Sequence, residues 1–439
     1  MLVALACLAG PVGAAEVADI LRHEEVTLKN GMRVLLLRDD RMPTVAIIMW
    51  YRVGSGDNLH GKTGLAHLFE HLMFKGSPNV ADGVIDKIAE EAGGSTNAYT
   101  ATDATVYFDV AAPPVIERML WAEGDRLARL DDAIDQAKLD NQRDVVLNER
   151  RQNYENRPYG EAEILLGEAL WPAGHPFHAP GIGYVEDLKS VTLDDARTFF
   201  DLHYTPSNAV MVVAGDIDVA ATRAWLERYL GWIPTQPRKP TPAPAPPPPI
   251  RERKVLSAED DVQVPRIYLR WRSVPGYTPE EPALDLATII LAGGKSSRLY
   301  QKLVVEERLA QEVYAGNSTE TRAGELTVVA TAKPGVSADR VREALDRELA
   351  AFLAAPPSEA ELDRAKNTRE ADFMRGLAPI QARAQRLADY AVNAGDANFL
   401  SKDLERYRTV TAREVHKAAI KYLRADAAVQ LTISPRKAP

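Results

Sequence analysis

The chain has 439 residues, of which 46% are hydrophobic and 26% charged, and its formal net charge is −9. This composition is typical of a packed globular protein and excludes a fibrous repeat or wholesale disorder. The acidic balance provides no basic surface for nucleic acid or an anionic membrane, so peptides or proteins are the expected partners and nucleic acid is not. At roughly 100–200 residues per domain, the length predicts more than one core.

The N-terminus carries an apolar run from Leu2 to Ala9, followed by small residues at positions 13–15. This order is typical of the core and cleavage region of a signal peptide, so we expect residues 1–15 to direct export to the periplasm or another compartment outside the cytoplasm. A bilayer-spanning helix needs about 20 apolar residues, so no stable membrane span is expected. Cys7, the only cysteine, lies in this run, and the exported chain is expected to contain no disulfide.

Apolar runs at 32–37 and 45–50 predict two strands near the start of the exported chain. A later strand is expected to consist of Asn97, Ala98, Tyr99 and Thr100. It should be exposed, because the run 105–110 follows as its hairpin partner. The free N–H and C=O groups of an edge strand can bind an extended peptide, although an ordinary edge strand is the alternative on these residues alone.

Between these strands lies the run His67-Leu68-Phe69-Glu70-His71 on a predicted helix. Residues four apart project from the same face, so His67 and His71 can direct two imidazole nitrogens at one point. Two neutral imidazoles are good zinc ligands, and Glu70 on the adjoining face can reach a water beside the ion without ligating it. The spacing is the inverted form of the HExxH arrangement of metallopeptidases and predicts a Zn²⁺ site with Glu70 as the catalytic base. The alternative is a pair of solvated helix histidines.

A catalytic zinc takes three protein ligands, so one more residue must come from elsewhere. The amphipathic helix expected at 135–156 offers Glu149 beside the apolar residues Val145, Val146 and Leu147, which predict burial at this turn. Spacing alone leaves four competitors open: Glu123, Asp125, Asp144 and Glu155. A surface salt bridge is the ordinary role for any of them.

A proline-rich run, PTQPRKPTPAPAPPPP, begins at Pro234 and predicts a stiff linker over 234–254. It divides the exported chain into a zinc-binding domain at 16–233 and a second domain at 255–439 without zinc ligands. Both parts open with strands, continue with an apolar helix and close with a strand, and the second also contains an amphipathic stretch, 359–393, expected to form one long helix. We therefore predict a duplicated α+β domain, each copy a largely antiparallel sheet packed with helices.

Three segments together resemble the pitrilysin or mitochondrial-processing-peptidase family of zinc peptidases: Gly64 to Gly76, Gly94 to Thr100, and the helix that carries Glu149. The resemblance covers nearly all of the exported chain. It implies two homologous domains facing each other as a clam-shell half-chamber. It also implies that Glu149 is the third zinc ligand, that the strand at 97–100 binds substrate, and that unfolded peptides or oligopeptides are cleaved.

The chain departs from the family pattern at three positions. Gln142 stands where the family often has a second Glu, which leaves a supporting acidic role there in doubt. Val304 and Gln311 replace an Arg and a Tyr that the family uses to stabilise the oxyanion, and Arg298 and Arg308 lie at other helix phases, where pairing or packing is the expected role. We therefore expect a homologous partner subunit that supplies the Arg/Tyr pair, in a heterodimer or higher heteromer.

The expected activity is that of a zinc metalloendopeptidase. Two alternatives remain open: a non-catalytic structural or processing-complex subunit of the same family, and a zinc-dependent chamber that holds peptides without cutting them. A second metal site at His175 and His178 is not expected, because Pro176 places both in a loop.

Overall fold

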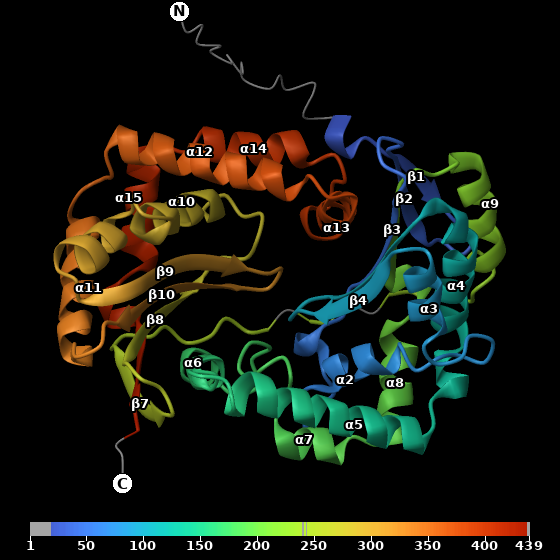
Figure 1. The fold of residues 1–439 in the computed structure, drawn as a ribbon, viewed down its shortest axis with the longest axis horizontal. Helices are drawn as coiled ribbons and strands as arrows, with labels where there is room; N and C mark the ends of the chain where they lie inside the picture. The colour runs from blue at the N-terminus through green and yellow to red at the C-terminus, as the bar shows by residue number, and fades with distance from the viewer. Residues whose placement is uncertain (1–18, 239–240, 243, 437–439) are drawn as a thin grey trace, which may run out of the picture.

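The computed structural model describes residues 19–238, 241–242 and 244–436, so the predicted signal peptide at 1–15 lies outside the described residues. Figure 1 shows two bodies, each a sheet with its own helices, at opposite ends of the long axis. The predicted α+β architecture is confirmed. Within the described ranges, no helix combines the length and the apolar character needed to cross a membrane.

The first sheet has six strands in the order β1-β2-β6-β3-β5-β4. Every neighbouring pair is antiparallel except β2 with β6. The strands are β1 (Glu24–Thr27), β2 (Arg33–Arg38), β3 (Val45–Tyr51), β4 (Ser95–Thr100), β5 (Thr105–Ala111) and β6 (Ala209–Gly215). β3 is buried along its whole length, as expected of a central strand covered on both faces, whereas β4 is the partly exposed edge.

The second sheet has the order β7-β11-β8-β10-β9, and its one parallel pair is β7 with β11. Its strands are β7 (Lys254–Asp260), β8 (Arg266–Ser273), β9 (Ala310–Thr319), β10 (Gly324–Ala332) and β11 (Val429–Pro435). This order and the place of the parallel pair repeat those of β2-β6-β3-β5-β4 in the first sheet. The predicted duplication is therefore visible in the topology, and β9 corresponds to β4.

Helices pack on both faces of each sheet. Those in the first part are α2 (Leu65–Leu72), α3 (Val84–Glu91), α4 (Ile116–Ala133), α5 (Gln136–Arg150), α6 (Ala162–Leu170), α7 (Val185–Ser190), α8 (Leu193–His203) and α9 (Val219–Tyr229). Those in the second are α10 (Glu281–Ala292), α11 (Ala338–Ala354), α12 (Glu359–Gly376), α13 (Ile380–Asp389), α14 (Leu400–Arg408) and α15 (Ala412–Tyr422). A core under α2, α4 and α8 fills one face of the first sheet, and a core under α10, α11 and α15 fills one face of the second.

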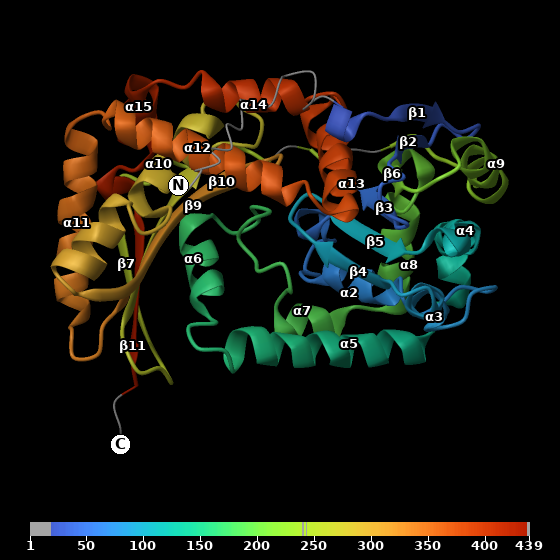
Figure 2. The ribbon, with the colours of Figure 1, turned by 45° about the horizontal axis from the view of Figure 1, so that its top comes forward.

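The two remaining sheet faces are covered by exchanged helices (Figure 2). α13, from the second part, packs on β3 and β6 of the first sheet, where Leu387 and Ala384 are fully buried. α6, from the first part, packs on β11 and β8 of the second sheet through Leu166 and Leu170. The domain limits 16–233 and 255–439 stay a prediction, and the exchange shows that each part completes its core with a helix from the other.

The prediction of one helix over 359–393 is wrong, because the chain breaks it between α12 and α13. Pro379 lies at the break, and proline has no N–H for a helical hydrogen bond and disfavours helical geometry in the residue before it. The break frees α13 to turn onto the first sheet. The described residues of the predicted linker 234–254 form neither helix nor strand before β7 begins at Lys254.

A buried ion-pair cluster joins the two parts beside the edge strand. Arg322, in the turn between β9 and β10, lies 2.6 Å from Asp57 Oδ1 and 2.6 Å from Asp103 Oδ1. Asp57 ends a short 3-10 helix after β3 and Asp103 lies in the turn between β4 and β5, and both side chains are almost fully buried. A side chain on Gly56 would approach Arg322 Nη1 to 2.9 Å, so glycine leaves room for the guanidinium.

Arg322→Ala should destabilise the protein by about 3 kcal/mol, because it leaves two buried carboxylates without their counter-ion. Urea unfolding followed by tryptophan fluorescence measures this. Arg38→Ala is the matched control, since Arg38 pairs with Asp40 at the surface, where such a pair contributes less than about 1 kcal/mol. An equal decrease in the free energy of unfolding of the two variants would show that the Arg322 cluster does not hold the two parts together.

Candidate metal centre

The helix α2 presents its two histidines on the side opposite its buried face. Leu65, Ala66, Leu68, Phe69 and Leu72 are buried, whereas His67 and His71 are partly exposed. The helix follows Gly64, whose φ of +84° favours glycine and whose added Cβ would meet the Ile182 carbonyl at 2.5 Å. Core packing therefore fixes the direction in which both imidazoles point.

The last turn of α5 brings Glu149 to these histidines. Leu139 and Val146 anchor α5 with no exposed surface, although Val145, expected to be buried, is 40% exposed. Glu149 Oε2 lies 3.2 Å from His67 Nε2 and 3.4 Å from His71 Nε2. The three side chains each place one donor atom within 4.8 Å of the other two. The predicted convergence of two imidazoles and a distant carboxylate is present.

This donor set fits zinc. Ligand atoms about 2.0–2.1 Å from a tetrahedral zinc lie roughly 3.4 Å apart, which matches the two distances to Glu149. Burial alone would lower the pKa of His67, but hydrogen bonds to Glu149 and Glu70 raise it to about 9. Hydrogen bonds from His67 and His71 hold the pKa of Glu149 well below its usual range. A zinc ion would take the place of the proton that these groups share.

None of the four competing carboxylates joins the two histidines. Glu123 is buried against Arg126, and Asp125 accepts hydrogen bonds from Ser77 and Asn79. Asp144 is exposed on α5, and Glu155 lies 3.9 Å from Arg150. Among the described residues, Glu149 is the carboxylate that completes the cluster with the two histidines.

Glu70 is buried beside the cluster rather than within it. Its Oε2 accepts a hydrogen bond from the Thr100 hydroxyl and lies 3.4 Å from His67 Nδ1. This carboxylate is therefore held near the metal position by a residue of the edge strand. A cavity of about 610 Å³ lies beside His67, Glu70, His71 and Glu149. Gln142, buried on α5, also lines it, and its amide N–H donates to Asn141 Oδ1.

The predicted strand at Asn97, Ala98, Tyr99 and Thr100 and its hairpin are confirmed. These residues belong to β4, which pairs with β5 on one side and ends the sheet on the other. They line the cavity that contains His67, Glu70, His71 and Glu149. An extended peptide added to this free edge would lie next to the metal position.

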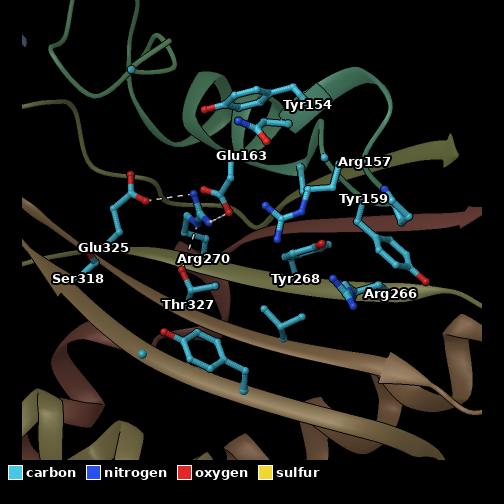
Figure 3. A pocket seen from close by; sticks show the side chains of 18 of the residues that line it. Tyr154, Arg157, Tyr159, Glu163, Arg266, Tyr268, Arg270, Ser318, Glu325 and Thr327 are labelled. Atoms are coloured by element: carbon cyan, nitrogen blue, oxygen red, sulfur yellow. Dashed lines mark hydrogen bonds and ion pairs between the residues drawn. The ribbon is translucent and has the colours of Figure 1, made fainter. Parts of the chain in front are cut away.

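A second cavity, of about 980 Å³, extends from His67, Thr100 and Glu149 to the inner face of the second sheet. Figure 3 shows its far wall, formed by the connection between α5 and α6 and by strands of the second sheet. The sequence interpretation missed the wall residues Arg157, Tyr159, Arg266, Tyr268 and Arg270. The alternation of polar residues at 266, 268 and 270 in a predicted strand was the available signal, because alternate residues share one face.

Comparison with known proteins agrees with this arrangement. Residues 33–171 match the family model described as insulinase (peptidase family M16), and residues 190–369 match the model described as the peptidase M16 inactive domain. The chain belongs to peptidase family M16. The predicted resemblance to pitrilysin-type peptidases is thereby confirmed.

Relatives in family M16 align along nearly the whole chain. Zinc protease PqqE of Helicobacter pylori is 28% identical over 422 residues, covering 94% of this chain and 93% of that protein. A probable mitochondrial-processing peptidase subunit beta of Arabidopsis thaliana is 24% identical over 413 residues, which cover 90% of this chain and 75% of that protein. The crystal structure of a protease from Helicobacter pylori superposes with a TM-score of 0.87 at 27% identity and covers 94% of this chain and 99% of that one. Peptidase function and zinc are thus features of the family to which this chain belongs.

The structure also shows the surroundings of the positions at which the chain departs from the family M16 pattern. Val304 packs against the core of the second part, and Gln311 is exposed at the start of β9. Arg298 forms a two-point ion pair with Glu361, and Arg308 is exposed, so pairing is confirmed for Arg298.

The two loop histidines pack against one tryptophan. The His175 ring stacks on Trp171 at 4.2 Å, and His178 Nδ1 lies 2.9 Å from the Trp171 carbonyl oxygen. Burial, together with the positive charges of Arg272 and Arg322, lowers the pKa of His175 to about 4. These contacts are those of packing residues.

Glu149→Gln should weaken zinc binding by at least roughly 100-fold, because a neutral amide replaces the anionic ligand. Zinc content after dialysis, measured by mass spectrometry, should be about one ion per chain in the unaltered protein and near zero in the variant. Asp144→Asn, an exposed change on the same helix, is the matched control and should retain the ion. A Glu149→Gln protein with full zinc would contradict the assignment.

Proposed function

We propose that this chain is the zinc-carrying subunit of a metalloendopeptidase that hydrolyses peptide bonds in unfolded peptides or oligopeptides. The observation that carries the proposal is the convergence of His67, His71 and Glu149 beside the buried Glu70 and the free edge of β4. A non-catalytic scaffold does not require three potential metal ligands together with a buried carboxylate and a free strand edge. Names such as zinc protease among the relatives support the same chemistry.

The residues of the chain divide the chemistry among them. Zinc, when bound, lowers the pKa of water toward about 7 and polarises a carbonyl group. Glu70 Oε2 takes the proton from the attacking water and delivers it to the departing amine nitrogen. The Thr100 hydroxyl orients that carboxylate through its hydrogen bond, and the backbone of β4 holds the peptide extended beside it.

Glu70→Gln should keep zinc and lower the cleavage rate of an unfolded peptide by a factor of about 10²–10⁴, because the amide cannot accept the proton. Peptide cleavage by mass spectrometry and zinc content are measured on the same samples. Glu91→Gln, at an exposed position on α3, is the control. Retained cleavage would remove Glu70 from the mechanism, and absence of zinc from the unaltered chain would favour the structural-subunit alternative.

The second part has neither an arginine nor a tyrosine at the two positions of the family's Arg/Tyr pair. Val304 is packed against a core and Gln311 is neutral, so neither position stabilises an oxyanion as an Arg or a Tyr hydroxyl would. Arg298 is neutralised by Glu361. We therefore propose that a homologous subunit with an Arg/Tyr pair completes the active enzyme as a heterodimer or higher heteromer.

The isolated chain should cleave peptides roughly 10²–10³-fold more slowly than its mixture with such a subunit, since that is the effect of losing an oxyanion donor. The test mixes the purified chain with a homologue that lacks the HxxEH motif but has Arg and Tyr at the positions aligned with 304 and 311. A form of this homologue without the Arg and Tyr is the control and should not stimulate. Full activity of the chain alone would contradict the proposal.

We also propose that the enzyme acts in the periplasm or another exported location. The apolar run from Leu2 to Ala9 and the small residues that follow it support export. The absence of cysteine after Cys7 agrees with a chain that folds without disulfides in an oxidising compartment.

A further inference from the structure

The cavity of about 980 Å³ contains two arginines that the zinc chemistry does not use. Arg157 comes from the connection between α5 and α6 in the first part, and Arg266 begins β8 in the second. Both line the cavity that also contains His67, Thr100 and Glu149. A peptide held on β4 beside the metal position can therefore extend toward them.

The third arginine of the wall is fully compensated and serves as a reference. Arg270 lies 2.8 Å from Glu163 and 3.1 Å from Glu325, and its Nε donates to Thr327 (Figure 3). Its side chain is 7% exposed. With two carboxylates around it, Arg270 joins α6 to the second sheet and has no charge to offer a ligand.

Arg157 and Arg266 have no such compensation. The ion pair of Arg266 with Glu312 is 3.8 Å long, and the Glu312 side chain is 69% exposed. Arg157 is exposed and, in the part of the chain that the structure describes, has no ion-pair partner within 4.0 Å. Figure 3 shows its side chain extending into the cavity toward Tyr268. Two positive charges thus face the same space from opposite parts of the molecule.

Tyr159 fixes the geometry of this wall. Its ring lies 3.9 Å below the guanidinium carbon of Arg266, its N–H donates to Asp260 Oδ2 at 2.6 Å, and its hydroxyl donates to the Val264 carbonyl at 2.8 Å. Its φ of +61° is unusual for a residue with a side chain and persists only where the surroundings impose it. Tyr159 therefore orients Arg266 by stacking and ties the loop of Arg157 to the second part.

We propose that Arg157 and Arg266 form a subsite for a substrate carboxylate, either an acidic side chain or the free C-terminus of the peptide cleaved at the metal centre. The guanidinium fork matches the geometry of a carboxylate, and Tyr159 and Tyr268 provide an aromatic floor for the carbons next to it. This inference rests on the proposed peptidase function and adds a substrate class to it.

The subsite acts in binding and not in the chemical step. In the described residues neither arginine has a hydrogen bond or ion pair with His67, His71 or Glu149, whose side-chain polar contacts are with one another, Glu70 and Asn153. Loss of either arginine should therefore raise KM for carboxylate-bearing peptides and leave kcat unchanged. A fall in kcat for neutral peptides would instead indicate a role in the transition state and overturn the proposal.

Binding can be measured without catalysis in full-length Glu70→Gln protein. Fluorescent ten-residue peptides carry one Glu at each position in turn, or Gln at the same position, with a C-terminal amide or a free acid. A carboxylate at the peptide position that reaches the two arginines should lower the dissociation constant, measured by fluorescence anisotropy, by roughly tenfold. The peptides with Glu at different positions test binding of a side-chain carboxylate, and the comparison of the free acid with the amide tests binding of the C-terminal carboxylate. Equal affinity for all peptides, or preference for Lys, would overturn the subsite.

Variants added to the Glu70→Gln protein identify the residues. Arg157→Gln should abolish the carboxylate preference and leave affinity for the neutral peptide unchanged, whereas Arg157→Glu should favour a Lys peptide. Arg151→Gln is the control, because Arg151 is exposed on the same connection and does not line the cavity. Arg266→Lys keeps the charge and removes the fork, so the preference should fall in a protein that retains its circular dichroism. Equal weakening of all peptides by Arg157→Gln would contradict the proposal.

The two hypotheses fail separately. Zinc-dependent cleavage by the unaltered chain and its partner, without carboxylate preference, would overturn the subsite and leave the peptidase proposal in place. Selective binding that Arg157→Gln abolishes, in a chain without zinc or cleavage, would support the subsite and overturn the peptidase proposal.

Discussion

The packing of α5 against α2 is the contact on which the candidate site depends. α2 carries two imidazoles and the buried Glu70, but it becomes a three-ligand site only because Val146 and Leu139 anchor α5 with Glu149 facing the histidines. Successive helix residues are turned by about 100°, so a shift of α5 by one residue would direct Glu149 away. The geometry of the candidate metal site is thus set by apolar contacts that lie outside the site.

The short-range part of this arrangement was predictable from sequence. The two imidazoles share a face because they are four residues apart on one helix, and β4 forms an edge because its hairpin partner follows directly. Glu149 was not predictable from spacing, since the choice among carboxylates depends on tertiary contacts such as that between Glu123 and Arg126. The expected burial of Val145 was wrong because three consecutive helix residues cannot all face one core.

The parts of the fold that sequence did not predict are long-range. Pro379 could have shown the break after α12, but nothing local indicates that α13 crosses to the first sheet or that α6 crosses to the second. The ion-pair cluster of Arg322 likewise joins residues more than 200 positions apart. The same is true of Arg157 and Arg266, which line one cavity because α6 is packed on a sheet from the other part of the chain.

The exchange of α6 links the metal position to the far wall of the cavity. One stretch of chain leaves Glu149, turns through Tyr159, which is hydrogen-bonded to Asp260 and Val264, and enters α6 on the second sheet. The Arg322 cluster ties the same two parts through Asp57, which follows β3, and Asp103, which follows β4. Because both connections join the parts that enclose the cavity, a rotation of one part against the other would move Glu149, β4 and the arginine wall relative to one another. The relative positions of Glu149, β4 and the wall arginines therefore depend on both parts, so the second part shapes the candidate site although none of its described residues joins the His67, His71 and Glu149 cluster.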